Sequence, residues 1–348
     1  MRRSHGSIAS PRCSPSAGSD TRGRPTPVEQ ARSQRGELQM NNYDCIVVGG
    51  GPAGLSAALV LARARREVLV VDGNRPRNRA TYMSHGFITR DGTPPMALRE
   101  LGREDLAKYP NVHFQWGEVQ HVTGVDGEFT ASIKGVRGGP SGEVQARKVL
   151  LATGVLEALP QVPDLISYYG STIFSCVHCD GWERREQSLV VIGENPELVN
   201  TAKRASQWAD REIVLTNGSG IIEEHQAEVL GRQGIEVDDT PIAALHGDGG
   251  RLESVELADG RVLPATGGFV QPEWSLPQVV ADLVPTAGDL GGVKTDEYGR
   301  SGVDGVYAAG DVRGITPSQL IIAAGEGARA GIGLNNDLIF ATFDAPGR

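Results

Sequence analysis

The sequence predicts an α/β protein built from two Rossmann-like three-layer domains, with the second domain inserted into the first. The main observation is that an apolar strand, a short turn, a helix and a second strand occur in this order twice, within residues 45–73 and within residues 188–218. A second observation is that strand and helix patterns suited to the first unit return late, at residues 305–334. Strands that alternate with helices form parallel sheets covered by helices.

These patterns divide the chain into segments. We expect residues 40–158 and 272–348 to form the first domain and residues 159–271 to form the second. Residues 1–39 are rich in Ser, Arg, Pro and Gly. They are predicted to be a disordered extension, because they hold too few large apolar residues to offset the cost of ordering. A transit peptide and a true start at Met40 are the alternatives for this segment.

Composition excludes several classes of function. The chain has 348 residues, of which 39% are hydrophobic and 22% charged, as is ordinary for a soluble globular protein. The net charge of -9 argues against a nucleic-acid partner, since phosphate binding needs a basic surface. The sequence has no apolar run as long as a membrane span and no apolar leader segment, so we expect no membrane partner and a cytoplasmic location.

The first strand–turn–helix unit carries a dinucleotide-binding fingerprint. Gly49, Gly51 and Gly54 have the GxGxxG spacing directly after an apolar strand, and Asp72 ends the next strand. This context makes the motif specific. The first Gly permits the turn, the second lets the backbone approach a pyrophosphate, and the third lets helix and strand pack closely. We expect the diphosphate at the helix N-terminus and Asp72 at a ribose hydroxyl.

Three later segments complete the first domain. KVLLATG (148–154) and GVYAAGDV (305–312) each predict a strand that runs into a turn, and PSQLIIAAGEGARAGIGL (317–334) predicts a helix rich in small residues. Ala and Gly are expected to let that helix pack closely against a large cofactor. Together with the fingerprint, these segments resemble the FAD domain of flavoproteins with two dinucleotide-binding domains. The resemblance implies that Asp311 contacts the flavin ribityl chain.

The second unit lies where such flavoproteins carry a nicotinamide-binding domain, but its fingerprint is broken. Gly193 is present, whereas Asn195 and Leu198 stand at the second and third positions. The next strand ends at Leu215 with neither an acid for a ribose hydroxyl nor an Arg for a 2′-phosphate after it. NADP is therefore a doubtful cofactor. Residues 251–270 predict a β-meander that completes this domain.

The stretch CVHCDGWE, residues 176–183, holds two of the four cysteines. A structural zinc site needs four ligands, and the sequence has no second CxxC or HxxxH. A structural disulfide across so short a loop would constrain the unfolded chain little. A redox-active dithiol beside a flavin explains both the spacing and the neighbouring motifs. In a CxxC turn at a helix start, the first thiol has a lowered pKa and the second resolves the mixed disulfide.

From Tyr43 to its end, the chain resembles the low-molecular-weight thioredoxin reductase family through the motifs GGGPAG, ATG, CxxCDG and AAGDV, in that order. The resemblance implies that Cys179 faces the flavin, that Cys176 exchanges with the substrate, and that Asp180 assists proton transfer. His178, inside the motif, is either a base toward an incoming thiol or a spacer residue.

The resemblance also implies FAD as the cofactor. Two roles are equally expected for His85. It lies beside the flavin, or it has a packing or backbone role. The predicted FAD-binding residues are Gly49, Gly51, Pro52, Ala53, Gly54, Asp72, Gly73, His85, Val119, Ala152, Thr153, Gly154, Gly310, Asp311, Gln319 and Leu320.

The departures from the family resemble a subgroup. The broken nicotinamide fingerprint, Trp182-Glu183 and the stretch HGFITRDGTPP (85–95) are similar to thioredoxin reductase-like dithiol oxidases of natural-product pathways, of the gliotoxin, holomycin and depsipeptide type. This implies a homodimer that closes a disulfide in a small-molecule dithiol and passes electrons through FAD to O2 or NADP+. The alternatives are an NADPH-dependent reductase of a thioredoxin-like protein and a non-catalytic redox sensor.

Overall fold

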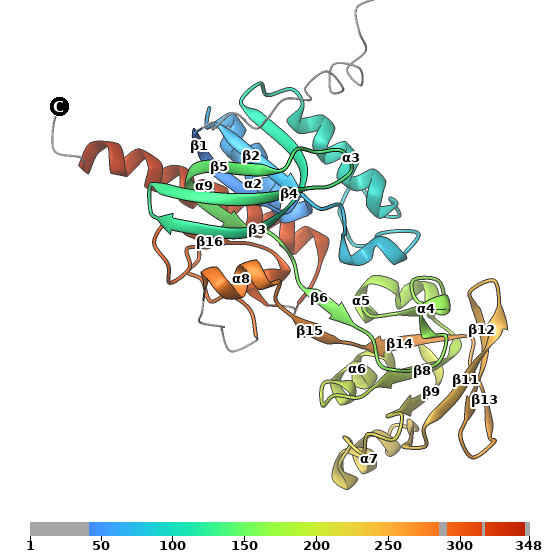
Figure 1. The fold of residues 1–348 in the computed structure, drawn as a ribbon. Coiled ribbons are helices and arrows are strands. Elements are labelled where there is room, and N and C mark those ends of the chain that lie inside the picture. Colours follow the sequence, from blue (N-terminus) through green and yellow to red (C-terminus); the bar gives the residue numbers. More distant parts are fainter. Residues whose placement is uncertain (1–41, 285–290, 315–316, 345–348) are drawn as a thin grey trace, which may run out of the picture. The chain divides into compact units, whose positions relative to one another are not determined.

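The computed structural model describes residues 42–284, 291–314 and 317–344 (Figure 1). The extension predicted at residues 1–39 lies outside these ranges. Within them, no helix is both long and apolar enough to cross a membrane.

The first α/β domain is built on a six-stranded sheet. Its parallel part has the strand order β3-β2-β1-β5-β16, and β3, β4 and β5 continue beyond it as antiparallel partners. All five residues of β2 are buried, as in a strand covered on both faces. The strands are β1 (Asn42–Val48), β2 (Val68–Asp72), β3 (Val112–Val125), β4 (Glu128–Gly135), β5 (Gly142–Leu151) and β16 (Val306–Ala308).

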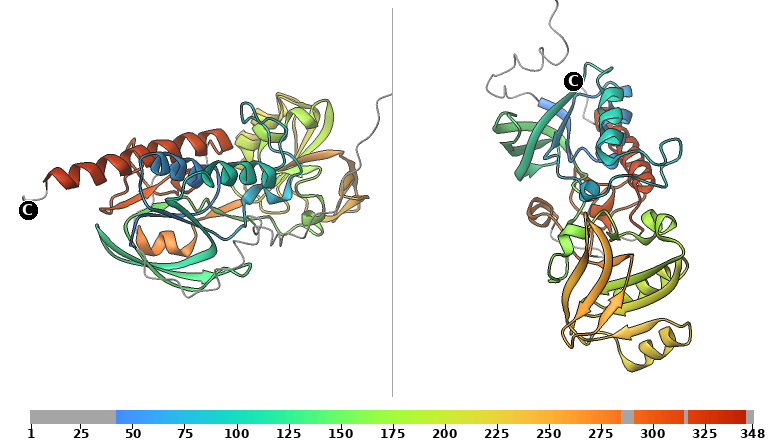
Figure 2. Two further views of the ribbon diagram at one scale, coloured as in Figure 1. Left: turned by 90° about the horizontal axis from the view of Figure 1, so that it is seen from above. Right: turned by 90° about the vertical axis from the view of Figure 1, so that its right-hand side faces the viewer.

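Two hydrophobic cores cover the two faces of this sheet. One core joins the sheet to α2, α3 and α9, and the other joins it to β4 and α8. Helices, parallel sheet and antiparallel extension thus form the three predicted layers (Figure 2). The helices are α2 (Pro52–Arg63), α3 (Pro95–Leu106), α8 (Gln278–Leu283) and α9 (Leu320–Asp344), with short 3-10 turns η1 (Arg77–Ala80) and η3 (Asp311–Arg313).

Helix α9 differs from its prediction in length and in the role of its glycines. It begins three residues later than expected and ends ten residues later, and it lies beside α2 (Figure 1). A Cβ atom at Gly327 would lie 1.9 Å from the Ala53 carbonyl oxygen, and one at Gly331 would lie 3.0 Å from the Ala57 oxygen. These glycines therefore permit contact between two helices, rather than the packing against a cofactor that the sequence suggested.

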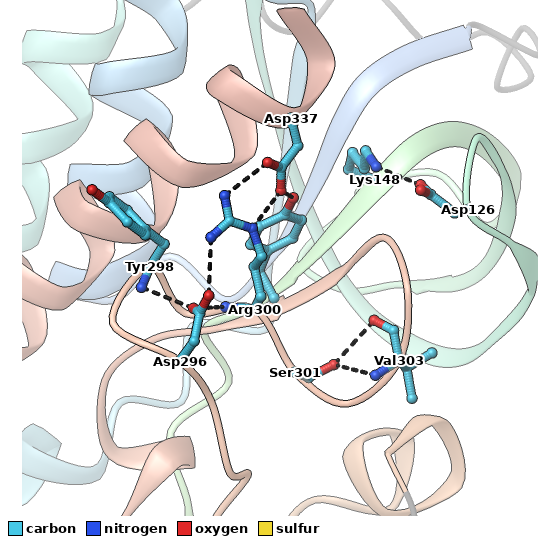
Figure 3. Close-up of polar contacts among 9 residues, drawn as sticks. Asp126, Lys148, Asp296, Tyr298, Arg300, Ser301, Val303 and Asp337 are labelled. Carbon is cyan, nitrogen blue, oxygen red and sulfur yellow. Dashed lines mark hydrogen bonds and ion pairs between the residues drawn. The ribbon is translucent and has the colours of Figure 1, made fainter. Parts of the chain in front are cut away.

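A polar network fixes α9 to the loop before β16. Arg300 donates from Nε and Nη2 to the two carboxylate oxygens of Asp337, each at 2.7 Å, and from Nη1 to Asp296 at 2.9 Å (Figure 3). The hydroxyl of Tyr307, on β16, donates to the same Asp337 carboxylate. Bidentate guanidinium–carboxylate pairs combine strength with fixed geometry, so they hold the helix in one position on the sheet.

The second α/β domain repeats this layered plan. Its parallel sheet has the order β10-β9-β8-β14-β7. One face packs against α5, α6 and α7, and the other packs against α4 and a three-stranded antiparallel sheet (Figure 1). The elements are α4 (Leu165–Tyr168), β7 (Ile173–Phe174), α5 (Val177–Asp180), η2 (Trp182–Arg184), β8 (Gln187–Gly193), α6 (Leu198–Ala205), β9 (Ala209–Leu215), α7 (Glu224–Gly231), β10 (Glu236–Asp238), β11 (Ile242–Asp248), β12 (Arg251–Leu257), β13 (Val262–Pro264) and β14 (Gly267–Gln271).

The predicted β-meander at 251–270 is only partly correct. Strand β12 pairs with both β11 and β13 in the antiparallel sheet, whereas β14 enters the parallel sheet between β8 and β7. All five residues of β14 are buried, which suits a central strand rather than a meander edge.

Two short strands, β6 (Leu156–Ala158) and β15 (Glu273–Ser275), pair in an antiparallel manner where the chain passes between the two domains. The domain boundaries expected after residues 158 and 271 remain a prediction.

Candidate redox site

A cavity of about 530 Å³ is lined mainly by residues of the first domain. This volume is within the range of small-molecule sites. The turn after β1, the ends of β2 and β5 and the start of α9 contribute to its walls. The predicted FAD-binding residues that line this first cavity are Gly49, Gly51, Pro52, Ala53, Asp72, Gly73, His85, Val119, Ala152, Thr153, Gly154, Gly310, Asp311, Gln319 and Leu320.

The three fingerprint glycines have different surroundings. Gly49 has φ +112°, and a Cβ there would lie 2.2 Å from the Ala152 carbonyl oxygen. A Cβ at Gly54 would lie 1.9 Å from the Gly49 oxygen, so Gly54 serves the packing of α2 against the turn. A Cβ at Gly51 would meet no described atom within 4 Å. Gly51 thus leaves open the space through which a diphosphate would approach, and this cradle fits FAD.

A buried arginine, which the sequence analysis missed, holds Asp72. Arg99 on α3 pairs with the Asp72 carboxylate and donates to the Gly50 carbonyl at 3.2 Å. The other Asp72 oxygen accepts the Asn74 amide at 3.0 Å. Burial lowers the pKa of Arg99, and the charge of Asp72 opposes this effect. In the sequence, Arg99 is one of several charges on an amphipathic helix, so its burial left no distinct pattern.

Asp311 also has an unexpected partner. Arg77 donates from Nη2 to the Asp311 carboxylate at 3.1 Å and to the hydroxyl of Ser318. The same guanidinium lies 5.2 Å from the centre of the Trp274 ring. Arg77 belongs to a short loop turn without a motif, so sequence reasoning gave no reason to select it.

The CxxC cysteines form a disulfide. Cys176 and Cys179 are bonded to each other. Cys176 is the residue before α5, and its Sγ accepts the backbone N–H of Cys179 at 3.2 Å. The Cys176 sulfur therefore already accepts one hydrogen bond from the backbone.

A second cavity, of about 440 Å³, lies against the same disulfide. Cys176 lines both cavities, whereas, in the described part of the chain, Cys179 and Asp180 line only the first. Polar residues outnumber apolar ones in the lining of this second cavity, although more of its surface is apolar, and the sequence did not predict this cavity. Besides the disulfide, its lining includes Arg77, Ser175, His178, Asn195, Glu197, Thr201, Arg204, Gln271, Trp274 and Gln319.

Gln319 contacts the disulfide directly. Its Nε2 donates to Cys176 Sγ at 3.4 Å and to Cys179 Sγ at 3.3 Å. The residue directly precedes α9 and lines both cavities. The sequence analysis assigned Gln319 to the flavin, and its contact with the sulfurs was not expected.

Asp180 is a buried carboxyl group that lines the first cavity. Burial, followed by the charge of Glu183, raises the pKa of Asp180 to about 7, and Arg184 opposes the shift. A carboxyl group with a pKa near 7 is suited to exchange protons at neutral pH.

The two histidines singled out in the sequence have different positions. His178 is exposed, lines the second cavity and meets the Trp208 ring edge-on at 6.1 Å between centroids. His85 lines the first cavity, and its ring nitrogens lie 3.6 Å from Asp91 and 3.7 Å from Glu183. Both histidines therefore lie at the redox site, on the walls of different cavities.

The broken nicotinamide fingerprint forms a closed turn. The Asn195 side chain donates to the Pro272 carbonyl at 3.2 Å and accepts the Glu197 amide at 3.2 Å. As a result, α6 begins only at Leu198, and the residue before it is an acid. In a working dinucleotide site this place is a helix N-terminus open to the diphosphate.

Comparison with known proteins identifies the family of this chain. Residues 43–327 match the pyridine nucleotide-disulphide oxidoreductase family. The chain belongs to this family. As a member of the pyridine nucleotide-disulphide oxidoreductases, it is an FAD-dependent disulfide oxidoreductase of the thioredoxin reductase-like type. When bound, FAD supplies a two-electron acceptor or donor for the cysteine pair.

Two curated relatives carry related names. A probable thioredoxin reductase of Arthroderma benhamiae is 34% identical over 192 residues, which are 54% of this chain and 46% of that protein. The chain thus spans about half the length of this relative. Thioredoxin reductase aclD of Aspergillus oryzae is 29% identical over 313 residues, 86% of this chain and 97% of that protein.

Solved structures agree with the fold. The putative thioredoxin reductase TrxB from Bacillus anthracis is 38% identical with a TM-score of 0.80, over 86% of this chain and 99% of that one. The structure of HlmI is 32% identical with a TM-score of 0.80, over 88% and 96% of the two chains. The predicted two-domain dinucleotide-binding fold is therefore confirmed.

Proposed function

We propose that this oxidoreductase is a dithiol oxidase. It closes a disulfide in a small-molecule, natural-product dithiol and passes two electrons through FAD to O2. The position of the redox disulfide carries the proposal, because Cys176 borders both cavities and Cys179 borders the cavity with the FAD fingerprint. A substrate in the second cavity meets Cys176 first, and the electrons leave on the Cys179 side.

The proposed exchange uses the two cysteine sulfurs in turn. A substrate thiolate bonds to Cys176 Sγ, the Cys176–Cys179 bond breaks, and its electron pair leaves on Cys179 as a thiolate. The second substrate thiolate then attacks the substrate sulfur of the mixed disulfide. The substrate disulfide leaves, and Cys176 is left as a thiolate. Two electrons now reside on the cysteine pair, and FAD, when bound, would accept them as the disulfide closes again.

Two side chains are proposed to move protons. His178, on the wall of the second cavity, takes the proton of the incoming thiol. Asp180, on the wall of the first, keeps Cys179 as the thiolate when its carboxyl group is ionised, because the carboxylate takes up any proton that reaches the Cys179 sulfur. Each base thus serves the sulfur on its own side of the disulfide.

The second cavity supports a small substrate. At about 440 Å³ it has the size of a small-molecule site, and its wall combines a larger apolar surface with many polar side chains. We infer that the dithiol is compact and presents both apolar surface and hydrogen-bonding groups.

The names of the relatives favour a second candidate, an NADPH-dependent reductase of a thioredoxin-like protein. The turn at Asn195 argues against it, because its side chain closes the turn and Glu197 adds a negative charge where a diphosphate would bind. A charge-assisted hydrogen bond contributes about 1.5–3 kcal/mol. Losing one or two weakens NADPH binding by about ten- to ten-thousand-fold, since each 1.4 kcal/mol is tenfold.

Anaerobic flavin reduction distinguishes these candidates. The flavin absorbance is followed after mixing with NADPH and, separately, with a small polar dithiol such as dithiothreitol. The oxidase proposal expects fast bleaching by the dithiol and slow bleaching by NADPH. Fast bleaching by micromolar NADPH would overturn it and favour the reductase. With neither reagent active, the redox-sensor alternative would be favoured.

We further propose a cytoplasmic homodimer. Helix α9 supports the dimer, because Ile332, Phe340 and Phe343 are exposed at spacings of eight and three residues, which place them on one helical face. A compartment that keeps thiols reduced delivers the substrate as a dithiol, which supports the cytoplasm.

A further inference from the structure

We propose that Gln319 is a catalytic residue of the redox centre, and that its side-chain amide stabilises the cysteine thiolate released when the Cys176–Cys179 disulfide opens. The inference rests on the established disulfide chemistry and holds for either direction of electron flow. It differs from the flavin contact that the sequence suggested for this residue.

The geometry places one amide on both reacting atoms. Gln319 Nε2 lies 3.4 Å from Cys176 Sγ and 3.3 Å from Cys179 Sγ. On the other side of the amide, Oε1 lies 3.4 Å from the position that a Cβ of Gly86 would take. Gly86 has φ +75°, a conformation that favours glycine, and this turn packs at van der Waals distance from Oε1. The Gln319 amide is thus seated between this turn and the disulfide.

The sulfurs differ in how strongly they need this donor. Cys176 Sγ also accepts a hydrogen bond from the Cys179 backbone amide at 3.2 Å. Among the described residues, Gln319 is the one donor to Cys179 Sγ. A disulfide sulfur is a weak acceptor, and a thiolate is a charged one. The contact therefore strengthens when the bond breaks, so it favours the open state over the closed one.

The electron balance of the step fixes where the amide acts. A substrate sulfur forms a bond to Cys176 Sγ, the Cys176–Cys179 bond breaks, and its electron pair stays on Cys179. The new negative charge appears on the atom 3.3 Å from Gln319 Nε2. In the reverse direction, the same amide stabilises the Cys179 thiolate before it attacks a mixed disulfide at Cys176.

The test measures the Cys179 thiolate directly in FAD-loaded protein. In a Cys176→Ser background, the thiolate–flavin charge-transfer absorbance is titrated against pH, with Gln319 intact, with Gln319→Met and with Gln319→Glu. The methionine variant keeps the length of the side chain without the donor. We expect its midpoint to rise by about one pH unit, equal to about 1.4 kcal/mol. The glutamate variant should rise further, because a carboxylate repels the thiolate.

Neighbouring charges are constant in this comparison. Asp180, His85 and Arg77 also line the first cavity, and none is altered in the variants. Gln233→Leu, an exposed glutamine on the second domain, is the matched control and should leave the midpoint unchanged.

A second readout uses the intact cysteine pair. The equilibrium between disulfide and dithiol in dithiothreitol buffers, quantified by thiol alkylation, should shift about tenfold toward the disulfide in Gln319→Met. Unchanged midpoints in both Gln319 variants, with normal FAD content, would overturn the proposal. A midpoint that rises equally in the methionine and glutamate variants would also overturn it, since that result indicates altered packing.

Discussion

At the scale of single residues, the role proposed for Asp180 predicts how proton transfer depends on pH. Its pKa is raised to about 7, mainly by burial. The ionised form is the base, so flavin reduction by a dithiol should accelerate as pH rises through about 7. Asp180→Asn should remove this inflection and slow the reaction by about 10²-fold or more. Stopped-flow reduction between pH 5.5 and 8.5 checks the prediction; an unchanged pH profile in the variant would contradict it.

The fingerprint glycines give a second prediction at this scale. Gly51→Val should fold but lose FAD, because its side chain enters the space open to the diphosphate. Affinity should fall at least about tenfold, or 1.4 kcal/mol. Gly54→Val is the contrast, since its Cβ would lie 1.9 Å from a carbonyl oxygen and the fold itself should fail. Flavin absorbance per protein and thermal unfolding by circular dichroism separate the two effects. Full FAD occupancy in Gly51→Val would sink the assignment.

Sequence patterns at this scale predicted the residues that belong to motifs. The glycines, the CxxC pair and the acids at strand ends have fixed spacing, and all of these predicted site residues except Gly54 line the first cavity. Arg77, Arg99 and Trp274 were missed because a partner distant in sequence gives each its role. An isolated charge looks the same in sequence whether it is solvated or buried.

At the scale of elements, the network around Asp337 anchors α9. Burial raises the pKa of Asp337, but hydrogen bonds from Arg300 and Tyr307 outweigh it and the net pKa is lowered. Asp337→Asn should cost about 1–2 kcal/mol at pH 7, a discounted value because Arg300 is partly exposed.

The sign of its pH dependence follows from the lowered pKa. The stabilisation is present above the unfolded pKa of about 3.9 and is lost as pH falls through the lower folded value. Urea unfolding at pH 7 and near pH 3 should therefore show a gap between wild type and variant that narrows in acid. Glu236→Gln, which removes an exposed pair with Arg211, should change stability by less than about 1 kcal/mol. A gap that widens in acid would contradict the assignment.

Predictions of elements were accurate where the local apolar pattern identifies a strand. They were wrong where the choice of neighbouring strand in the sheet had to be predicted. The strands at 68–72 and 148–151 have short apolar runs, and both lie in the predicted sheet. The meander failed because β14 and its neighbours in sequence have similar local patterns and differ only in their partners. The small residues of α9 were assigned to a cofactor because sequence does not distinguish a close helix from a close ligand.

At the scale of the whole molecule, the proposed dimer gives a prediction. The side chains of Phe340 and Phe343 are 58% and 82% exposed on α9. If a second copy covers them, Phe340→Asp should yield a monomer that retains FAD. Light scattering measures the mass, and Val125→Asp, at another exposed apolar residue, is the control. A monomeric wild type would refute the dimer.

The two-domain plan was predictable because the strand–turn–helix–strand unit occurs twice and the late FAD motifs lie beyond the second copy. The second cavity was not, because its wall combines segments around residues 77, 176, 195, 274 and 319, which share no motif. Chemistry carried by a local motif is visible in sequence, and a surface assembled from distant segments is not.

The sharing of one disulfide by two cavities has a protective consequence. Under the proposed function, electrons would cross from one cavity to the other through Cys176 and Cys179, while the substrate itself would stay on the Cys176 side. If O2 is the acceptor, hydrogen peroxide forms in the flavin compartment, and the wall delays its contact with substrate thiols. Peroxide converts thiolates to sulfenic and sulfinic acids. The partition would thus direct the substrate toward a clean disulfide, with the enzyme's own cysteines as the groups most exposed to oxidative damage.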